Sequence, residues 1–235
     1  MRRAVVLLSG GLDSATCLAL AVRDGFEAHA LSFDYGQRHR VELEVAARVA
    51  KALGAASHRV VAVDLRSLGG SALTSDAIPV PKARTLAEIG HGIPPTYVPA
   101  RNTVFLAIAI GAAEVLEADA VYLGVNALDY SGYPDCRPEF LDAMQEVARR
   151  GTRRGVEGHP LELRAPLLRA SKAEIAAMAV AFGVPVAATL SCYDPVGPAS
   201  APVHCGRCDA CLLRQKGFAE ARLPDPTTYA ERTGT

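Results

Sequence analysis

Six consecutive residues near the start of the chain have the types that bind a phosphate group: Ser9, Gly10, Gly11, Leu12, Asp13 and Ser14. An apolar run precedes them and a helical pattern follows, so the glycines would lie in a turn between a strand and a helix N-terminus. Glycine lets the backbone approach an anion closely, and the first amides of a helix lack internal partners. The two serines add hydroxyl donors. The pattern therefore predicts a phosphate-binding loop.

Asp13 needs a separate explanation, because a carboxylate and a phosphate repel each other. Beside a bound phosphate, we expect Asp13 to hold a magnesium ion that contacts the phosphate oxygens. The loop is not a Walker motif, since no lysine follows its glycines, and the G-x-G-x-x-G pattern of dinucleotide sites is absent. The alternative is an ordinary strand-to-helix turn in which Asp13 or Ser14 caps the helix.

Four of the six cysteines cluster near the C-terminus, at Cys192, Cys205, Cys208 and Cys211. Four sulfurs match tetrahedral zinc, and a closed four-thiolate site leaves no position for substrate, so we expect a structural ion that pins the C-terminal tail. An iron–sulfur cluster, or ligation by His204 or Asp209, is the alternative. Cys136 lacks an evident base, so a small buried thiol, as for Cys17, is preferred over a nucleophile.

Residues 124–140 carry side chains suited to a flat heterocycle. Tyr130 and Tyr133 can stack on a ring, while Asp135 and Arg137 can hydrogen-bond to its edges. Prolines would stiffen the segment. The alternative is an irregular structural loop.

Three basic residues are candidates for anion contacts. Arg38 follows the second expected strand and could bind a phosphate or a substrate carboxylate, while Arg101 opens a long helix and could reach a triphosphate. Lys172 opens another helix, where an ordinary surface lysine is the alternative.

Local structure alone could explain several of their neighbours. His39 could lie on a solvated helix face, and Asn102 has the type of an N-cap. Ser171 and Glu174 have the spacing of a capping box.

Alternating strands and helices must position these residues. Val41, Val45, Val49 and Leu53 recur every four residues as one packing stripe, and Gly54 stands where a helix would end. We expect a parallel sheet with helices on both faces and ligands at the carboxyl ends of the strands. Residues 66–99, rich in glycine and proline, are expected to be a lid, a substrate loop or a disordered segment. The expected strands are 4–8, 28–33, 60–65, 120–125 and 161–168, and the expected helices are 14–23, 38–53, 102–117, 138–149 and 171–182.

Composition narrows the class of partner. The 235 residues carry a formal net charge of zero, which argues against a duplex or tRNA binder and favours small molecules. No run of apolar residues is long enough to span a membrane, and the start of the chain makes a poor signal peptide. We expect a cytoplasmic protein folded as a single domain over 1–235, with a zinc-binding segment at about 190–220.

The loop Ser9 to Ser14 resembles the signature of the PP-loop ATP pyrophosphatases. Residues 33–39, 98–102, 124–140 and 171–174, with the cysteine cluster, make the chain similar to the 7-cyano-7-deazaguanine synthase family from about Val5 to Phe218. There are two departures. Leu190 stands where we expect a tryptophan that stacks near the site, and His204 stands where proline is usual.

The resemblance implies an adenine nucleotide alpha hydrolase-like, Rossmann-like fold and conversion of 7-carboxy-7-deazaguanine and ammonia to the nitrile, through an activated carboxylate and an amide. It also implies Mg²⁺ with ATP, one structural Zn²⁺ and a homodimer. Free ammonia is the favoured nitrogen source, and a glutaminase partner is the alternative. Catalysis would fall to Asp13, Arg101 and Lys172. The implied ATP contacts are Leu8, Ser9, Gly10, Gly11, Leu12, Asp13, Ser14 and Ala15, and the implied substrate contacts are Arg38, Tyr130, Tyr133, Asp135 and Arg137.

Two other functions fit parts of the pattern. A tRNA thiolase of the same superfamily would use Cys136 or a zinc cysteine to carry sulfur. A nucleotide-sensing or nucleic-acid-binding module with a zinc ribbon would bind RNA in a salt-sensitive way without ATP turnover. The neutral charge counts against both.

Overall fold

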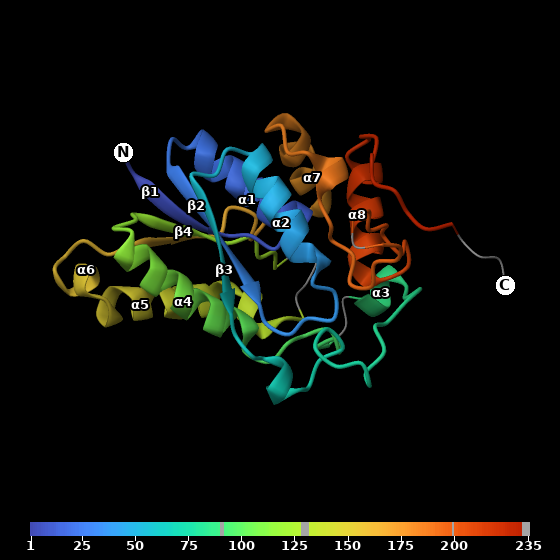
Figure 1. Ribbon diagram of the computed structural model, residues 1–235, viewed down its shortest axis with the longest axis horizontal. Helices are drawn as coiled ribbons and strands as arrows, with labels where there is room; N and C mark the ends of the chain where they lie inside the picture. The colour runs from blue at the N-terminus through green and yellow to red at the C-terminus, as the bar shows by residue number, and fades with distance from the viewer. Residues whose placement is uncertain (90–91, 128–131, 199, 232–235) are drawn as a thin grey trace.

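A five-stranded sheet in which every strand runs parallel forms the centre of the described chain (Figure 1). The computed structural model describes residues 1–89, 92–127, 132–198 and 200–231. The strands lie in the order β3-β2-β1-β4-β5, so the order reverses beside β1. Their bounds are β1 Arg3–Leu7, β2 Glu27–Asp34, β3 Ser57–Ala62, β4 Ala120–Tyr122 and β5 Glu162–Arg164. The expected parallel α/β fold is confirmed.

Helices cover both faces of this sheet, as expected. In Figure 1, α1, α2 and α7 lie on one side and α4, α5 and α6 on the other. The buried apolar side chains form two clusters. Their bounds are α1 Leu12–Arg23, α2 Val41–Ala52, α3 Leu86–Ile89, α4 Arg101–Val115, α5 Pro138–Gly151, α6 Arg153–Val156, α7 Lys172–Ala181 and α8 Asp209–Glu220. No described helix is long and apolar enough to span a bilayer.

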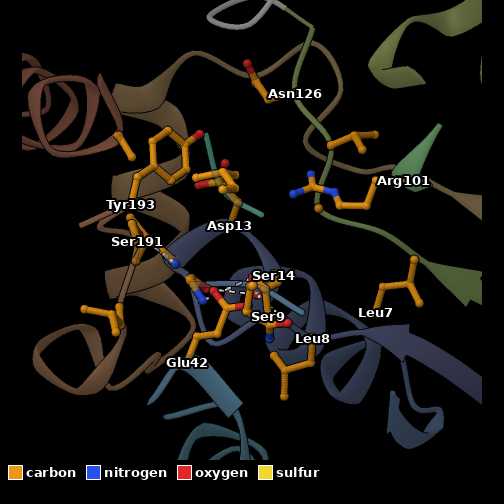
Figure 2. Close-up of a pocket in the computed structure, with 18 of the residues that line it drawn as sticks. Leu7, Leu8, Ser9, Asp13, Ser14, Glu42, Arg101, Asn126, Ser191 and Tyr193 are labelled. Carbon is orange, nitrogen blue, oxygen red and sulfur yellow. Dashed lines mark hydrogen bonds between the residues drawn. The ribbon is translucent and has the colours of Figure 1, made fainter. Parts of the chain in front are cut away.

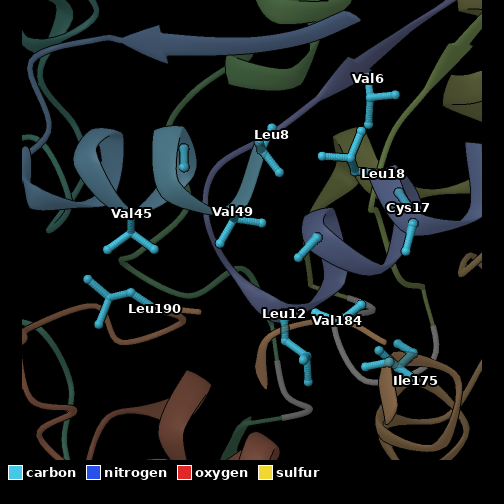
Figure 3. Close-up of a cluster of buried hydrophobic side chains, with 14 of the residues drawn as sticks. Val6, Leu8, Leu12, Cys17, Leu18, Val45, Val49, Ile175, Val184 and Leu190 are labelled. Atoms are coloured by element: carbon cyan, nitrogen blue, oxygen red, sulfur yellow. The ribbon is translucent and has the colours of Figure 1, made fainter. Parts of the chain in front are cut away.

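Burial explains why β1 is central and β3 lies at the edge. Ala4, Val5 and Val6 are at most 1% exposed, because helices cover both faces of β1. In β3, by contrast, most side chains reach solvent. Figure 3 shows Val6 of β1 and Leu18 of α1 in the same apolar cluster. This cluster fixes the end of β1, and with it the loop that follows.

The stripe predicted for α2 is confirmed, since Val45 and Val49 are buried in the same core. Gly54 follows the helix in the left-handed region, at a φ of 73°. The capping box is also confirmed: the Glu174 amide donates to the Ser171 hydroxyl over 3.2 Å, and the Glu174 carboxylate accepts from the Ser171 amide. Both signals are local in sequence, which is why spacing alone revealed them.

Helix α8 was not expected from the sequence. Its apolar and polar side chains are mixed around the circumference, so no amphipathic pattern marks it. It packs against α7, and Gly217 permits the close approach: a Cβ there would lie 2.7 Å from the Lys172 carbonyl oxygen. Tertiary packing, not local periodicity, therefore explains this helix.

The described part of the glycine- and proline-rich passage is folded onto the body. The Ala72 amide donates to the Pro95 carbonyl over 2.8 Å, and the Arg38 amide donates to the Leu73 carbonyl over 3.0 Å. Arg84, near α3, pairs with the buried carboxylate of Asp209 in α8. Residues 66–89 and 92–99 thus connect the loop after β2 to residues 190–214, which carry the four cysteines and are called the cysteine segment. The expectation that residues 66–89 and 92–99 are disordered is wrong.

Candidate active site

A cavity of about 310 Å³ opens at the carboxyl ends of the strands, where the strand order reverses. This is the position at which open parallel sheets bind ligands. Its walls come from the loop after β1, the start of α2, the start of α4, the segment after β4, α7 and the cysteine segment. Figure 2 shows side chains from these elements around one space.

The expected phosphate loop is held in shape by its own serines. The Ser9 amide donates to the Ser14 hydroxyl over 3.2 Å, the two hydroxyls lie 3.1 Å apart, and the Gly11 amide donates to the Ser9 hydroxyl over 3.3 Å (Figure 2). Gly11 is the N-cap residue of α1 and has no side chain, so the alternative in which Asp13 or Ser14 caps the helix is wrong. One amide of the first turn, that of Leu12, donates to the Ser191 hydroxyl of a distant segment. A helix N-terminus whose own N-cap residue supplies no acceptor suits an anion.

Two glycines bring backbone against this loop. Gly10 has a φ of 85°, and a Cβ there would lie 2.9 Å from the Ala46 amide nitrogen and 3.0 Å from the Glu42 carbonyl oxygen in α2. At Gly124, after β4, a Cβ would lie 2.9 Å from the Ser14 amide nitrogen. Any other residue at either position would displace the loop or cover the start of α1.

Asp13 and Lys172 form an ion pair on the cavity wall, with Nζ and Oδ2 2.5 Å apart. The lysine side chain is only 12% exposed, so the alternative of an ordinary surface lysine is wrong. The pair brings an ammonium group to the start of α1. It also leaves a carboxylate oxygen donor beside the loop, which is the donor type that Mg²⁺ prefers.

Arg38 and Arg101 also line the cavity. Arg38 is held from outside, because its Nε lies 3.2 Å from a carboxylate oxygen of Asp76. Burial would lower the pKa of Arg101, but the nearby hydroxyls of Tyr35 and Tyr133 help raise it above its ordinary value. His39 lies on the cavity wall with its ring 3.1 Å from Asp194, not on a solvated helix face.

Asn102 is not an N-cap, and this expectation is corrected. Helix α4 begins at Arg101 after Ala100, whose φ is 53°. The Asn102 amide donates to the Asp135 carboxylate over 3.0 Å, and the Asn102 side chain donates to the Asp135 carbonyl over 3.0 Å. The cap thus comes from 33 positions along the chain, and this geometry favours a capping role for Asp135 over a substrate contact.

The other residues expected to bind substrate are distributed unevenly. Tyr133 lines the cavity, with its hydroxyl 2.8 Å from that of Thr96. Arg137 is exposed at the start of α5 and is not among the described lining residues. Tyr130 lies outside the described residues. Burial and the neighbouring Asp135 raise the pKa of Cys136 to about 12, which fits a thiol that stays protonated.

The four cysteines meet in one buried cluster. Their sulfur atoms all lie within 4.8 Å of one another, with Cys192 and Cys208 3.9 Å apart and Cys208 and Cys211 3.5 Å apart. Around one tetrahedral zinc with Zn–S bonds of about 2.3 Å, sulfurs lie about 3.8 Å apart. In an iron–sulfur cluster the four cysteines are divided between two or four irons, so they cannot all lie as close together as around a single ion. The cluster therefore fits a single zinc ion.

Backbone amides support the same assignment. The amides of Asp194 and Cys205 donate to the Cys192 sulfur over 3.3 and 3.2 Å, and the Cys208 amide donates to the Cys205 sulfur over 3.3 Å. Donors of this kind stabilise thiolates. The two alternative ligands are otherwise engaged: Asp209 pairs with Arg84, and the His204 Nε2 accepts from the Ser191 amide over 3.2 Å.

The cysteine segment also grips the phosphate loop. The Leu190 amide donates to the Gly10 carbonyl over 2.9 Å, and the Leu12 amide donates to the Ser191 hydroxyl over 3.2 Å. Arg214 of α8 donates to the same hydroxyl over 3.2 Å. The Leu190 side chain lies in the apolar core and on the cavity wall, so an aliphatic residue stands where a stacking ring was expected.

Sequence reasoning missed Glu42, Ser191 and Arg214 as cavity residues. Glu42 follows the first apolar position of the α2 stripe, and nothing in its spacing separates it from the exposed Glu44. Ser191 and Arg214 reach the loop only because the cysteine segment folds back. For these three residues the sequence held no local signal.

The sequence also matches known proteins. Residues 3–222 match the model of a family described as "Queuosine biosynthesis protein QueC". The chain belongs to the QueC family. A 7-cyano-7-deazaguanine synthase of Anaeromyxobacter dehalogenans is 63% identical over 230 residues, covering 98% of this chain and 97% of that protein. Another, from Myxococcus xanthus, is 56% identical over 231 residues, covering 98% and 99%.

The fold of this QueC family member also resembles solved structures. One is a 4-thiouridine synthetase in complex with RNA and bound ATP, with a TM-score of 0.51 and 20% identity. The match covers 97% of this chain and 47% of the 4-thiouridine synthetase chain. At this identity the likeness shows the fold alone.

Proposed function

We propose that this chain is a 7-cyano-7-deazaguanine synthase, which converts 7-carboxy-7-deazaguanine, ammonia and ATP to the nitrile. The observation that carries the proposal is that near-full-length relatives with this activity in their names share 56–63% of its residues. The geometry supports the proposal, because the phosphate loop and Tyr133, a residue expected to contact the deazapurine, line the same cavity. A ligase that joins a nucleotide to a second substrate needs both in reach of each other.

The loop would hold the pyrophosphate portion of ATP while the substrate carboxylate attacks the α-phosphorus. The N-terminus of α1, the Lys172 ammonium and the Arg101 guanidinium would supply fixed positive charge where the negative charge develops. Asp13, with its carboxylate at the edge of the loop, is the residue that would hold Mg²⁺. When bound, this ion would neutralise charge on the phosphate oxygens.

Ammonia would then displace AMP from the activated carboxyl carbon and give the amide. A second ATP in the same site would activate the amide oxygen, and loss of AMP with the nitrogen-bound protons gives the nitrile. We propose that Tyr133 and Arg38 help position the deazapurine, since both line the cavity. Contacts from Tyr130 and Arg137 remain proposals that rest on the family resemblance.

We propose that the cysteine cluster holds one structural zinc ion. Four thiolates complete a tetrahedral shell, so no coordination position is left for substrate. Its effect on activity would be indirect, through Leu190 and Ser191, which bond to the phosphate loop.

Four further properties are proposed. A homodimer rests on the resemblance alone, and a single domain rests on the chain length. The net charge of zero supports small-molecule substrates without a nucleic-acid partner. A cytoplasmic location follows from a biosynthetic activity that consumes ATP.

The test is incubation of the protein with ATP, Mg²⁺, ammonium and 7-carboxy-7-deazaguanine, followed by mass spectrometry. The proposal predicts the nitrile, preceded by the amide. If neither forms, the proposed function is wrong. A Cys136→Ser variant that keeps nitrile formation would also separate this activity from sulfur transfer, which would need a reactive thiol.

A further inference from the structure

If the proposed function holds, the amide-forming step releases a proton that a group in the cavity must accept. Our inference about the residue that accepts it rests on that function. When ammonia bonds to the activated carboxyl carbon, its nitrogen becomes positively charged. Unless a base takes a proton, the adduct returns to reactants by expelling ammonia. General bases that act at this point contribute about 10²–10⁴-fold to a rate.

Among the described residues, two carboxylates line the cavity, Asp13 and Glu42. Asp13 is occupied by the Lys172 ammonium at 2.5 Å. Glu42 has no such ion pair with a described residue, and it lies on the first turn of α2. Its backbone is fixed beside the phosphate loop, since a Cβ at Gly10 would lie 3.0 Å from the Glu42 carbonyl oxygen. In Figure 2, Glu42 enters the cavity from α2 and Arg101 from α4.

The surroundings keep Glu42 able to exchange a proton near neutrality. Burial raises the pKa of Glu42 to about 7, the charge of Asp34 adds to this, and Arg101 and a hydrogen bond from Gln37 oppose it. Beside Asp34 and Arg101, the described titratable groups that interact with Glu42 include Tyr35, whose pKa the charge of Glu42 helps to raise. A base works best when its pKa lies near the working pH.

Other titratable groups on the cavity wall are poorer acceptors. Burial raises the pKa values of Tyr35, Tyr133 and Cys136 above their ordinary range, so all three keep their protons. The ring nitrogen Nε2 of His39 is engaged with Asp194 at 3.1 Å. Among the described residues, Glu42 is left as the cavity carboxylate that forms no ion pair with a cation.

We propose that Glu42 is the catalytic base of the amide-forming step. The ammonia lone pair forms the new C–N bond, and the Glu42 carboxylate takes one proton from the resulting ammonium nitrogen. The C–O bond to AMP then breaks, and AMP leaves with that electron pair. Ammonia and the acyl adenylate thus become amide, AMP and a protonated Glu42, which returns its proton to water.

The two partial reactions separate this role from binding, because formation of the acyl adenylate from the carboxylate and ATP moves no proton. We would compare Glu42→Gln with Glu44→Gln, an exposed acid on the same helix turn. Without ammonia, carboxylate-dependent exchange of pyrophosphate into ATP reports the adenylate. With ammonia, a single-turnover assay reports the amide.

Glu42→Gln should keep pyrophosphate exchange within about twofold of wild type and lose about 10²–10⁴-fold in amide formation. Hydroxylamine, a neutral amine at pH 7, should still trap its adenylate as the hydroxamate. In wild type, the amide rate per free ammonia should fall below about pH 7 as Glu42 is protonated, and this limb should vanish in the variant. Glu44→Gln should match wild type throughout.

The proposal is overturned if Glu42→Gln forms the amide at the wild-type rate. It is also overturned if the folded variant loses pyrophosphate exchange as severely as it loses amide formation. The second result would make Glu42 a binding residue. If Glu42→Gln does not fold, Glu42→Asp takes its place. This variant should retain pyrophosphate exchange and the fall in amide rate at low pH. If a folded Glu42→Asp loses both, the proposal is overturned. A wild-type protein that makes neither adenylate nor amide would contradict the proposed function instead.

Discussion

The ion pair between Asp13 and Lys172 joins two residues that only the family resemblance, and not their local sequence patterns, had grouped together. They are 159 positions apart, and only the packing of α7 beside α1 brings them to 2.5 Å. Residue type and local spacing indicated that Asp13 belongs to a phosphate loop. Spacing could not indicate that Lys172 stands over it, because the contact depends on how two distant helices cross the sheet.

The first prediction concerns the number of ATP sites. If one loop serves both activation steps, Asp13→Ala should abolish amide and nitrile formation alike, because it removes the carboxylate proposed to hold Mg²⁺ and leaves Lys172 unpaired. We would supply either the carboxylate or the isolated amide as substrate and measure products by mass spectrometry. A variant that still converts the carboxylate to the amide, but not the amide to the nitrile, would refute a shared site.

The second prediction concerns Glu42 and stability. Its pKa is raised from 4.5 to about 7 in the folded chain, so the folded state binds this proton more tightly than the unfolded one. Stability should therefore fall as the pH rises from about 4.5 to about 7. Glu42→Gln removes this dependence and should be more stable than wild type at pH 8 by about 1–3 kcal/mol.

Urea denaturation of wild type and Glu42→Gln at both ends of this range would check the second prediction. The stability advantage of the variant should shrink toward pH 5, where the folded carboxyl is already protonated. An advantage that stays constant with pH would mean that Glu42 titrates normally and would also remove the support that its pKa gives to a role as base.

Among the helices, local sequence signals predicted the features that are complete within a few residues. They missed the features that depend on residues distant in sequence. The α2 stripe, its closing Gly54 and the capping box before α7 were predicted correctly, since each is complete within a few residues. The cap of α4 was not, because Asp135 reaches it across the fold. Helix α8 was missed for the same reason, as its burial depends on α7.

The third prediction tests the contact between the phosphate loop and α2. Gly10→Ala and Gly54→Ala both place a side chain at positive φ, at a cost of about 1–2 kcal/mol each. Only Gly10→Ala also forces a Cβ against α2, since nothing lies within 4 Å of the corresponding position at Gly54. Gly10→Ala should thus weaken ATP binding more than tenfold, and Gly54→Ala should leave it unchanged.

Calorimetric titration of both variants with a non-hydrolysable ATP analogue would measure this difference. Equal affinities would show that the close approach of Gly10 to α2 does not shape the loop.

The fourth prediction concerns the cysteine segment. Cys211→Ser should lose its zinc and, with a stability loss of about 4 kcal/mol, melt about 8–16 °C lower. Because Leu190 and Ser191 bond to the phosphate loop, affinity for the ATP analogue should fall as well. Cys136→Ser, outside the cluster, should keep its zinc.

Metal analysis, a thermal melt and the same titration would check the fourth prediction. Zinc loss with unchanged ATP affinity would contradict the proposed link between the cysteine segment and the phosphate loop.

Over the whole molecule, the fold class followed from alternation alone, while the site required the topology. Parallel strands place the loops after β1, β2 and β4 at one edge, which is why residues from separate motifs were expected to meet. The order β3-β2-β1-β4-β5 could not be derived from local patterns. It places the phosphate loop at the reversal point, and the fold-back of residues 190–214 closes the cavity around it.

The central claim is that this one cavity takes a carboxylate to a nitrile in two ATP-dependent steps. A quenched time course that measures carboxylate, amide, nitrile and AMP in one reaction tests it most directly. We predict that the amide accumulates first and then decays as the nitrile forms. The final yield of AMP should approach two molecules for each molecule of nitrile. A chain that leaves the carboxylate and ATP unconsumed, with ammonia and Mg²⁺ present and the protein folded, would contradict the account.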